Sequence, residues 1–139
     1  MTDALVQFLR ARLDDDEQVA RRVEDQSAPW GGQWVADEAG ALRTRNGHVL
    51  AYGHVSTDGR ELPIPLKPGL VEHWARHDPA RALADVDAKR QALDHYERCV
   101  RHIRGDDAYV LAEGAVGRQV QYMALPYADH PDYRKEWKP

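Results

Sequence analysis

The sequence predicts an α+β fold, in which a small antiparallel β-meander packs beside three to four helices, including one long helix at about 79–104. Three observations support this prediction. Apolar residues recur three and four positions apart near both ends of the chain, which is the period of a one-sided helix. Short segments around Asn46-Gly47 carry the signal of a β-hairpin. Proline and glycine clusters separate the two kinds of segment.

The first predicted helix covers 3–24. Thr2 or Asp3 can cap it, because a short oxygen side chain accepts hydrogen bonds from the free N–H groups of the first turn. An acidic run, residues 14–17, lies in its middle, and four consecutive acids point around most of a helix. These side chains therefore cannot all converge on one ion, and we interpret them as a solvated face.

The predicted β-meander covers 33–62. Its strands are expected near 33–36, 41–45 and 48–55, with a two-residue type I′ turn at Asn46-Gly47 and another turn at Asp58-Gly59. A proline-rich connector follows at 63–68, and because proline cannot donate a hydrogen bond to a sheet, we expect it to be an edge or an extended linker.

The second half, 69–125, is predicted to be helical. A short helix at 69–77 precedes the long helix, which Asp78 can cap, with Pro79 in the first turn and Gly105 as a terminator. A last helix ends before Pro126, and a tail, 126–139, completes the chain. We expect all of 1–139 to form a single domain, since its length is that of one domain.

Composition limits the class of protein. Cys99 is the only cysteine among 139 residues, so an intrachain disulfide is excluded. No basic stretch followed by an apolar run begins the sequence, and no apolar segment approaches the length of a membrane span. We therefore expect a cytoplasmic protein without a membrane partner. The net charge of -4 argues against broad binding to a nucleic-acid backbone.

His73 and His77 form the first candidate metal site. Residues four apart share a helix face, so two imidazoles there could bind one transition metal. A zinc protease motif would need a glutamate where this chain has Trp74, which excludes that activity. Two ligands alone do not complete a metal site, and packing roles for both histidines are favoured.

His95, Cys99 and His102 form the second candidate, on one side of the long helix. One ion cannot bind all three, because His95 and His102 are about 10 Å apart along the helix axis. Only neighbouring pairs could chelate, and packing is again favoured. Cys99 as a nucleophile is disfavoured, because the middle of a helix does not lower a thiol pKa.

Two longer motifs resemble a known family. They are HWARHDPARALADVDAKR, residues 73–90, and ALPYADHPDYRKEW, residues 124–137, and the segments 8–14 and 28–30 also fit. Together they resemble an uncharacterised family of small actinobacterial and actinophage proteins, a domain of unknown function. The resemblance implies no established activity. The association of these relatives with mobile elements implies an accessory role.

We therefore expect a small non-enzymatic interaction or accessory module with a protein partner or with self-association as a homodimer. The exposed side of helix 79–104 or the sheet edge would form the interface, and aromatic residues often anchor such surfaces. The candidate surface residues are Trp30, Trp34, Trp74, His77 and Trp137. The alternative is a metal-dependent or small-molecule-binding enzyme that uses His73 and His77 with a residue of the long helix. Nucleic-acid binding is the weaker alternative.

Overall fold

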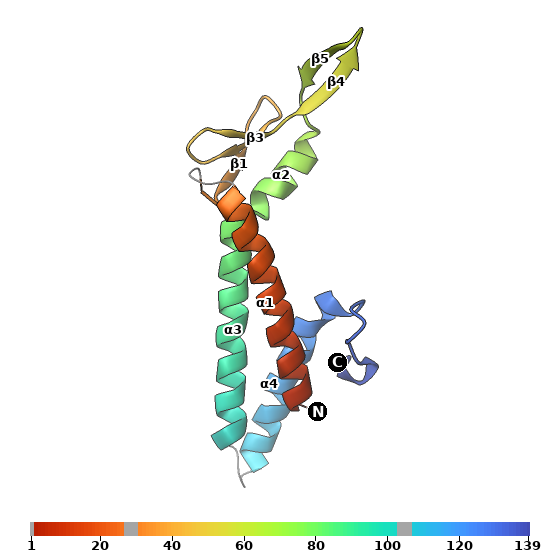
Figure 1. The fold of residues 1–139 in the computed structure, drawn as a ribbon. Coiled ribbons are helices and arrows are strands. Elements are labelled where there is room, and N and C mark those ends of the chain that lie inside the picture. The colour runs from red at the N-terminus through yellow and green to blue at the C-terminus, as the bar shows by residue number, and fades with distance from the viewer. Residues whose placement is uncertain (1, 27–30, 103–106) are drawn as a thin grey trace. The chain divides into compact units, whose positions relative to one another are not determined.

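The computed structural model describes residues 2–26, 31–102 and 107–139 and confirms the α+β fold, with four helices and two small antiparallel sheets (Figure 1). The helices are α1 (Thr2–Gln26), α2 (Pro68–Arg76), α3 (Pro79–His102) and α4 (Asp107–Ala124). The strands are β1 (Trp34–Ala36), β2 (Leu42–Thr44), β3 (Val49–Ala51), β4 (Gly53–Thr57) and β5 (Arg60–Ile64). Two 3-10 turns, η1 (Leu125–Tyr127) and η2 (Lys135–Trp137), follow α4.

The chain forms two compact units, and each is described by itself. The helical unit comprises Met1–Asp16 and Asp85–Pro139, and the sheet unit comprises Glu17–Ala84. Helices α1 and α3 contribute residues to both units. The expectation of one domain over 1–139 stays a prediction.

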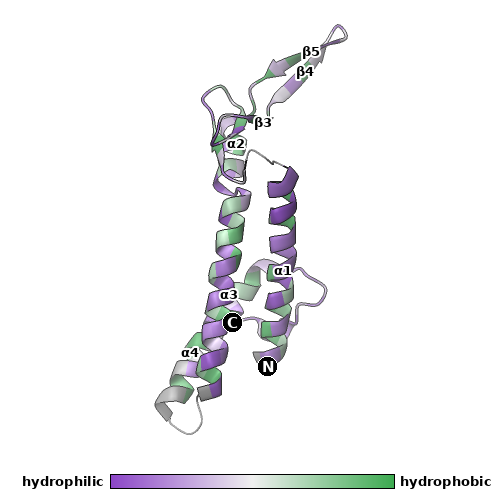
Figure 2. Cartoon of the chain, turned by 60° about the vertical axis from the view of Figure 1, so that its left-hand side comes forward, coloured by the Kyte–Doolittle hydropathy of each residue, from purple (hydrophilic) through white to green (hydrophobic). Residues whose placement is uncertain are grey.

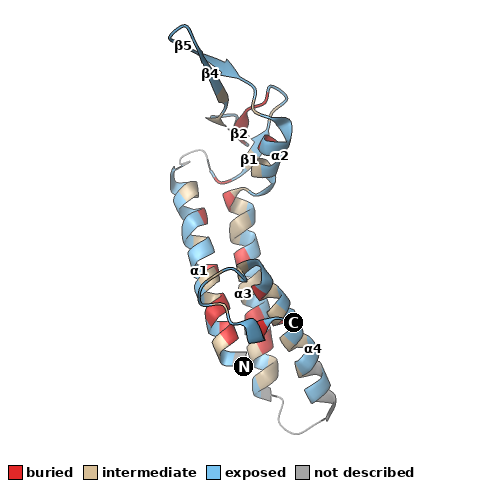
Figure 3. Cartoon of the chain, turned by 90° about the vertical axis from the view of Figure 1, so that its right-hand side faces the viewer, coloured by how far each residue is buried: buried red, intermediate tan, exposed pale blue. Residues whose placement is uncertain are grey.

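The core of the helical unit follows from the spacing of its apolar residues. Leu5, Leu9 and Leu13 recur every four positions on α1, and all three are almost completely buried. The core continues on α3 and α4, as the red residues of these helices in Figure 3 show. It contains Leu5, Val6, Phe8, Leu9, Leu13, Val86, Leu93, Tyr96, Val120, Ala124 and Trp137.

The acidic run on α1 spreads around the helix, as its sequence indicates, but each acid has its own partner. Asp14 pairs with Arg90, Asp15 with Arg12, Asp16 accepts from the Tyr127 hydroxyl, and Glu17 pairs with Arg21. Asp14 and Asp15 remain more than half exposed. The run is therefore solvated, yet it also joins α1 to α3 and to the segment after α4.

The tail returns to α1 within the helical unit (Figure 1). Trp137 is 3% exposed, and its ring lies 5.1 Å from that of Phe8, between centroids. Tyr127, His130 and Tyr133 also contact Phe8 at ring-centroid distances of 5.6–6.4 Å. Aromatic rings in this range attract each other edge to face. The tail thereby completes the core of the helical unit.

The sheet unit contains the three-stranded meander, in the order β1-β2-β3, and α2. Trp34 pairs with Thr44, Ala36 pairs with Leu42, and Leu42 pairs with Ala51. Leu42 and Thr44 of the central strand are buried, and so is Val71 of α2. The sheet unit is thus organised around a much smaller apolar core than the helical unit.

The turns differ from the sequence prediction. Asn46-Gly47 is not a type I′ turn, because only Gly47 has a positive φ, at 92°. Thr44 accepts a hydrogen bond from the Gly47 amide and donates its own amide to His48, so a three-residue loop with a bulge joins β2 to β3. The two-residue turn with positive φ at both positions is Asp58-Gly59, at 51° and 75°.

The predicted strand at 48–55 is wrong in its length. The structure divides this segment into β3 and the start of β4, and β4 pairs with β5 as a separate hairpin. The second turn signal, Asp58-Gly59, closes that hairpin. The proline-rich connector therefore lies partly in an edge strand, as Pro63 does in β5, and partly in α2, which begins at Pro68.

Gly40 holds the connector against the meander. Its φ is 78°, and a Cβ added there would lie 2.6 Å from Cβ of Pro65. The Gly40 carbonyl accepts a hydrogen bond of 2.8 Å from the Leu66 amide. Only glycine combines this backbone conformation with so close an approach.

Asp78 caps α3, as predicted. Its carboxylate accepts from the amide of Arg81 at 2.8 Å and from that of Trp34 at 3.1 Å. The predicted end of this helix, including Gly105, lies outside the described residues. In the part of the chain that is described, we find no helix with the length and apolar character needed to cross a membrane.

Candidate functional site

His73 and His77 lie side by side at the end of α2. Their ring centroids are 4.3 Å apart, and both residues are exposed. Nδ1 of His77 lies 2.8 Å from the carbonyl oxygen of His73. Since a carbonyl only accepts, this nitrogen is the donor, and in the neutral imidazole Nε2 would then have the lone pair that a metal needs. The pair thus retains ligand capacity while one nitrogen caps its own helix.

His95 and Cys99 form a second pair, in the helical unit. The Cys99 sulfur lies 3.6 Å from Nε2 of His95, a separation that suits a weak S–H to nitrogen hydrogen bond. His95 is exposed and Cys99 is half-buried. His102 ends α3, and its side chain lies outside the described residues. Packing therefore does not enclose this pair on α3.

Among the residues that the structure describes, no group of three or more histidine, cysteine, aspartate or glutamate side chains could hold a metal ion. His73 and His77 belong to the sheet unit, and His95 and Cys99 belong to the helical unit. Each pair supplies two ligands, whereas zinc sites use three or four. Neither pair by itself is a metal centre.

The five residues predicted as an interaction surface have different environments. Trp34 and Trp74 are half-buried in the sheet unit, and His77 is exposed. Trp137 is not a surface anchor, because the tail buries it against Phe8. Trp30 lies outside the described residues. Sequence spacing could not show the burial of Trp137, since its partner Phe8 lies at the other end of the chain.

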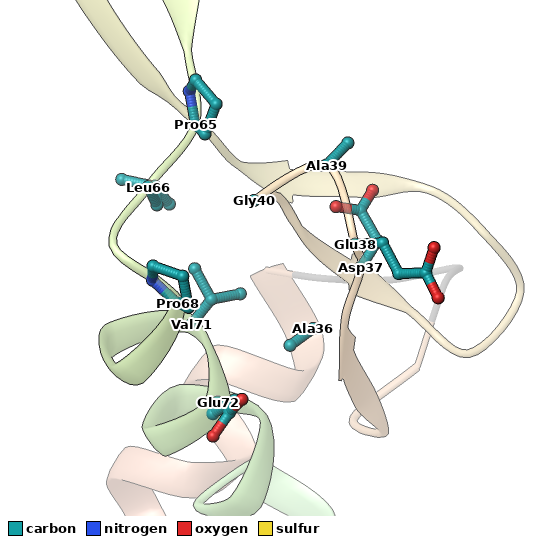
Figure 4. A pocket seen from close by; sticks show the side chains of 10 residues that line it. All are labelled: Ala36, Asp37, Glu38, Ala39, Gly40, Pro65, Leu66, Pro68, Val71 and Glu72. Carbon is teal, nitrogen blue, oxygen red and sulfur yellow. The ribbon is translucent and has the colours of Figure 1, made fainter.

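A pocket of about 440 Å³ lies between the meander and the start of α2 (Figure 4). Val71 points from α2 toward the strand that carries Ala36, and Pro65, Leu66 and Pro68 form the opposite wall. Among the described residues that line it, none is a serine, cysteine or histidine. Three carboxylates, those of Asp37, Glu38 and Glu72, also line it, so the pocket combines a small apolar surface with acidic groups.

Asp37 at the rim of this pocket already has structural partners. Its carboxylate pairs with Arg43 and accepts from the Ala41 amide at 2.8 Å. The hydrogen bond from Arg43, followed by the one from Ala41, lowers the pKa of Asp37 below its ordinary value. Asp37 is thus held as a carboxylate that fixes the turn into β2 and is poorly suited to accept a catalytic proton.

The β4–β5 hairpin has an apolar face that sequence reasoning missed. Val55 pairs with Leu62, and Ile64 pairs with Gly53, so Val55, Leu62 and Ile64 share one face. They are 40%, 48% and 41% exposed. Figure 3 colours almost the whole hairpin as exposed, and Figure 2 shows apolar segments in it. Alternating apolar residues on both sides of Asp58-Gly59 were the signal that could have revealed it.

Residues 2–139 match a family described as "Family of unknown function (DUF6221)". The match covers nearly the whole chain, including both motifs on which the resemblance rests. No curated protein and no solved structure matches the chain significantly.

Proposed function

We propose that this chain, which belongs to that family of unknown function, is a non-enzymatic interaction module that self-associates through the β4–β5 hairpin. The observation that carries the proposal is the exposed apolar face formed by Val55, Leu62 and Ile64. Contiguous apolar surface of this kind marks interaction sites in proteins. The single free cysteine, Cys99, suits a reducing cytoplasm, where we place the module.

The hairpin also needs a partner for its own stability. An isolated two-stranded hairpin is only marginally stable in water, and a third strand or a packed layer makes it stable. Its β5 strand is exposed at every residue from Arg60 to Ile64. A second copy would supply the missing layer with an identical apolar face.

The charges around the apolar face favour one arrangement of two copies. Arg60 shares this face and lies at the tip of the hairpin, opposite Thr57. We consider two hairpins stacked face to face, related by a two-fold axis that is perpendicular to the strands and parallel to the sheets. This arrangement places each Arg60 over the base of the partner hairpin, where Gly53 and Ile64 pair. The two guanidinium groups then stay apart, whereas a parallel arrangement would place like charges together.

Sedimentation velocity from micromolar to submillimolar concentration tests the proposal. We expect the wild type to form dimers and Leu62→Lys to remain monomeric, because the lysine places a charge in the centre of the apolar face. Ser56→Lys is the matched control, since Ser56 pairs with Glu61 on the opposite face. A wild type that stays monomeric throughout, or a Leu62→Lys variant that dimerises equally well, would overturn self-association.

A further inference from the structure

The outer edge of β4 carries an inference that deepens the proposed self-association and rests on it. In the part of the chain that the structure describes, β5 is the only strand that pairs with β4 (Figure 1). Four of the five residues of β4 are exposed. A strand with one neighbour presents unpaired N–H and C=O groups along its other side, and these groups can pair with a further strand.

The turn of the hairpin fixes which of its residue pairs are hydrogen-bonded. Asp58-Gly59 has a positive φ at both residues, as a two-residue type I′ turn requires. The residues that flank such a turn, here Thr57 and Arg60, form a hydrogen-bonded pair. Hydrogen-bonded and non-hydrogen-bonded pairs then alternate along an antiparallel ladder, so the register determines the type of every other pair in the hairpin.

The two edges of the hairpin are not equivalent. By this alternation, the pairs of Ser56 with Glu61 and of His54 with Pro63 are non-hydrogen-bonded. In such pairs the N–H and C=O groups of both residues point away from the partner strand. The outer edge of β4 thus carries two donors and two acceptors, from His54 and Ser56. The outer edge of β5 lacks one donor, because Pro63 has no N–H group.

The residue types of the two strands repeat this difference between the edges. Natural proteins protect edge strands against pairing with proline or with charged side chains. Strand β5 contains Arg60, Glu61 and Pro63. Strand β4 has the sequence GHVST and contains no proline, lysine, arginine, aspartate or glutamate. The outer edge of β4 is therefore the one that is open to a further strand.

We infer that this edge pairs with the β4 edge of a second copy, in antiparallel orientation, with Val55 opposite Val55 of that copy. In this register His54 lies opposite Ser56 of the second copy, and both residues use their outward N–H and C=O groups. Four backbone hydrogen bonds then join the copies across a two-fold axis. A shift by two residues would place His54 or Ser56 opposite a residue outside β4, so it would satisfy fewer groups of the strand.

The side chains of β4 suit this register. A two-fold axis perpendicular to the sheet keeps the same face of both copies on one side, so Val55, Leu62 and Ile64 of both copies form one continuous apolar surface. The two valines form a non-hydrogen-bonded pair, in which side chains approach most closely and β-branched residues pack well. On the other face each His54 lies beside a serine, so protonation places no like charges directly opposite each other.

The proposed face-to-face dimer promotes this pairing. A single edge contact is weak, because each backbone hydrogen bond replaces bonds to water. The dimer axis crosses the strands at the level of Val55 and Leu62, so both β4 strands lie on the same side of the dimer. Two dimers can therefore form two edge contacts at once, and the first contact raises the effective concentration for the second. The two kinds of axis are perpendicular and meet at the level of Val55, which closes the assembly at four copies.

Sedimentation velocity of the full-length chain, extended to the highest soluble concentration, tests the inference. We expect wild-type dimers to associate into tetramers. Ser56→Pro should form dimers and no tetramers, because it removes an outward N–H group of β4 and leaves the hydrogen bonds to β5 in place. Glu61→Pro is the matched control, since it removes the corresponding N–H group from the outer edge of β5 and should still form tetramers.

Amide hydrogen exchange of the wild type provides a second measurement. The amides of His54 and Ser56 should exchange more slowly as tetramers form, whereas the Val55 amide, which points toward Leu62, should change less. Wild-type dimers that never form tetramers, tetramers of Ser56→Pro as abundant as those of the wild type, or exchange at His54 and Ser56 that does not depend on concentration would each overturn the inference. Dimers that Leu62→Lys abolishes would still support the proposed function in these cases. A wild type that stays monomeric would instead overturn both.

Discussion

The helical unit contains the larger buried apolar core, although Val110 and Leu111 of α4 remain 60% and 78% exposed, whereas the sheet unit leaves a paired apolar face in contact with solvent. Leu5, Leu9 and Leu13 are at most 2% exposed, while Val55, Leu62 and Ile64 are at least 40% exposed. The helical unit therefore gains its stability mainly from burial. The sheet unit depends more on backbone geometry, at its turns and where Gly40 lies against Pro65. Its exposed apolar face remains available to a partner.

The largest expected effect comes from the same substitution made in both units. Leu93→Ala removes a side chain that is 0% exposed, and should lower the free energy of unfolding by about 2–5 kcal/mol. Leu62→Ala, at a residue that is 48% exposed, should change it by less than about 0.5 kcal/mol at concentrations where the chain is monomeric. Urea unfolding followed by circular dichroism measures both. Equal losses would contradict the comparison.

A second pair of substitutions examines the backbone of the sheet unit. Gly40→Ala should cost about 3 kcal/mol, because it adds a strained positive φ and a clash with Pro65. Gly47→Ala keeps the strain but meets open space, so about 1 kcal/mol is expected. Amide exchange of Leu66, which donates to Gly40, should accelerate in the first variant. Similar exchange rates in both would show that the close approach contributes nothing.

Two tyrosines of the helical unit give a smaller contrast. Tyr127→Phe should lower the free energy of unfolding by about 1 kcal/mol, since it removes the hydrogen bond to Asp16. Tyr133→Phe removes a buried hydroxyl that has no partner in the described chain, and should be neutral within about 0.5 kcal/mol. Thermal unfolding compares the two. A larger loss for Tyr133→Phe would show that its hydroxyl has a structural partner.

Tyr127 also predicts a loss of stability in alkali. Burial, followed by the hydrogen bond to Asp16, raises the pKa of Tyr127 in the folded chain. The folded state therefore binds this proton more tightly than the unfolded state, and the resulting stability is complete below pH 10. This stability decreases as the pH rises above that value. The free energy of unfolding, measured at increasing pH, should therefore fall less in Tyr127→Phe than in the wild type.

The smallest expected effect is an acid dependence that both units share. Hydrogen bonds from Arg43 and from Arg10 lower the pKa values of Asp37 and Asp94 below 3.8. Each carboxylate therefore stabilises the folded state above pH 3.8, and this contribution is lost as pH falls below it. Unfolding curves between neutral pH and pH 3 should show a weaker acid dependence for Asp94→Asn than for Asp94→Glu.

Local signals in the sequence predicted the helical elements well. Asp78-Pro79 marks the start of α3 because capping and proline geometry involve only neighbouring residues. The apolar spacing of α1 similarly predicted a helix close to the observed one. Such signals do not require knowledge of the rest of the chain, and the residues that carry them lie within one or two turns of each other.

The sequence was less informative where two turn signals competed or where contacts join distant residues. Asn46-Gly47 and Asp58-Gly59 carry similar turn signals in the sequence. They differ in the number of residues between the paired strands, and only Asp58-Gly59 forms a two-residue turn. A pocket that Arg12 of α1 lines could not be predicted, because its other wall begins at Pro131. The burial of Trp137 depends on the same distant contact. Local patterns do not report contacts of this kind.

The division of the chain has a consequence for the order of folding. The sheet unit is one continuous segment, Glu17–Ala84, whereas the helical unit joins the segments on either side of it. If the whole intervening segment were still unfolded, bringing α1 to α3 and the tail would require closure of a long loop, at a cost in entropy. Early formation of the meander and α2 shortens the effective loop. Substitutions such as Gly40→Ala should therefore slow the assembly of the helical core, although they lie outside it.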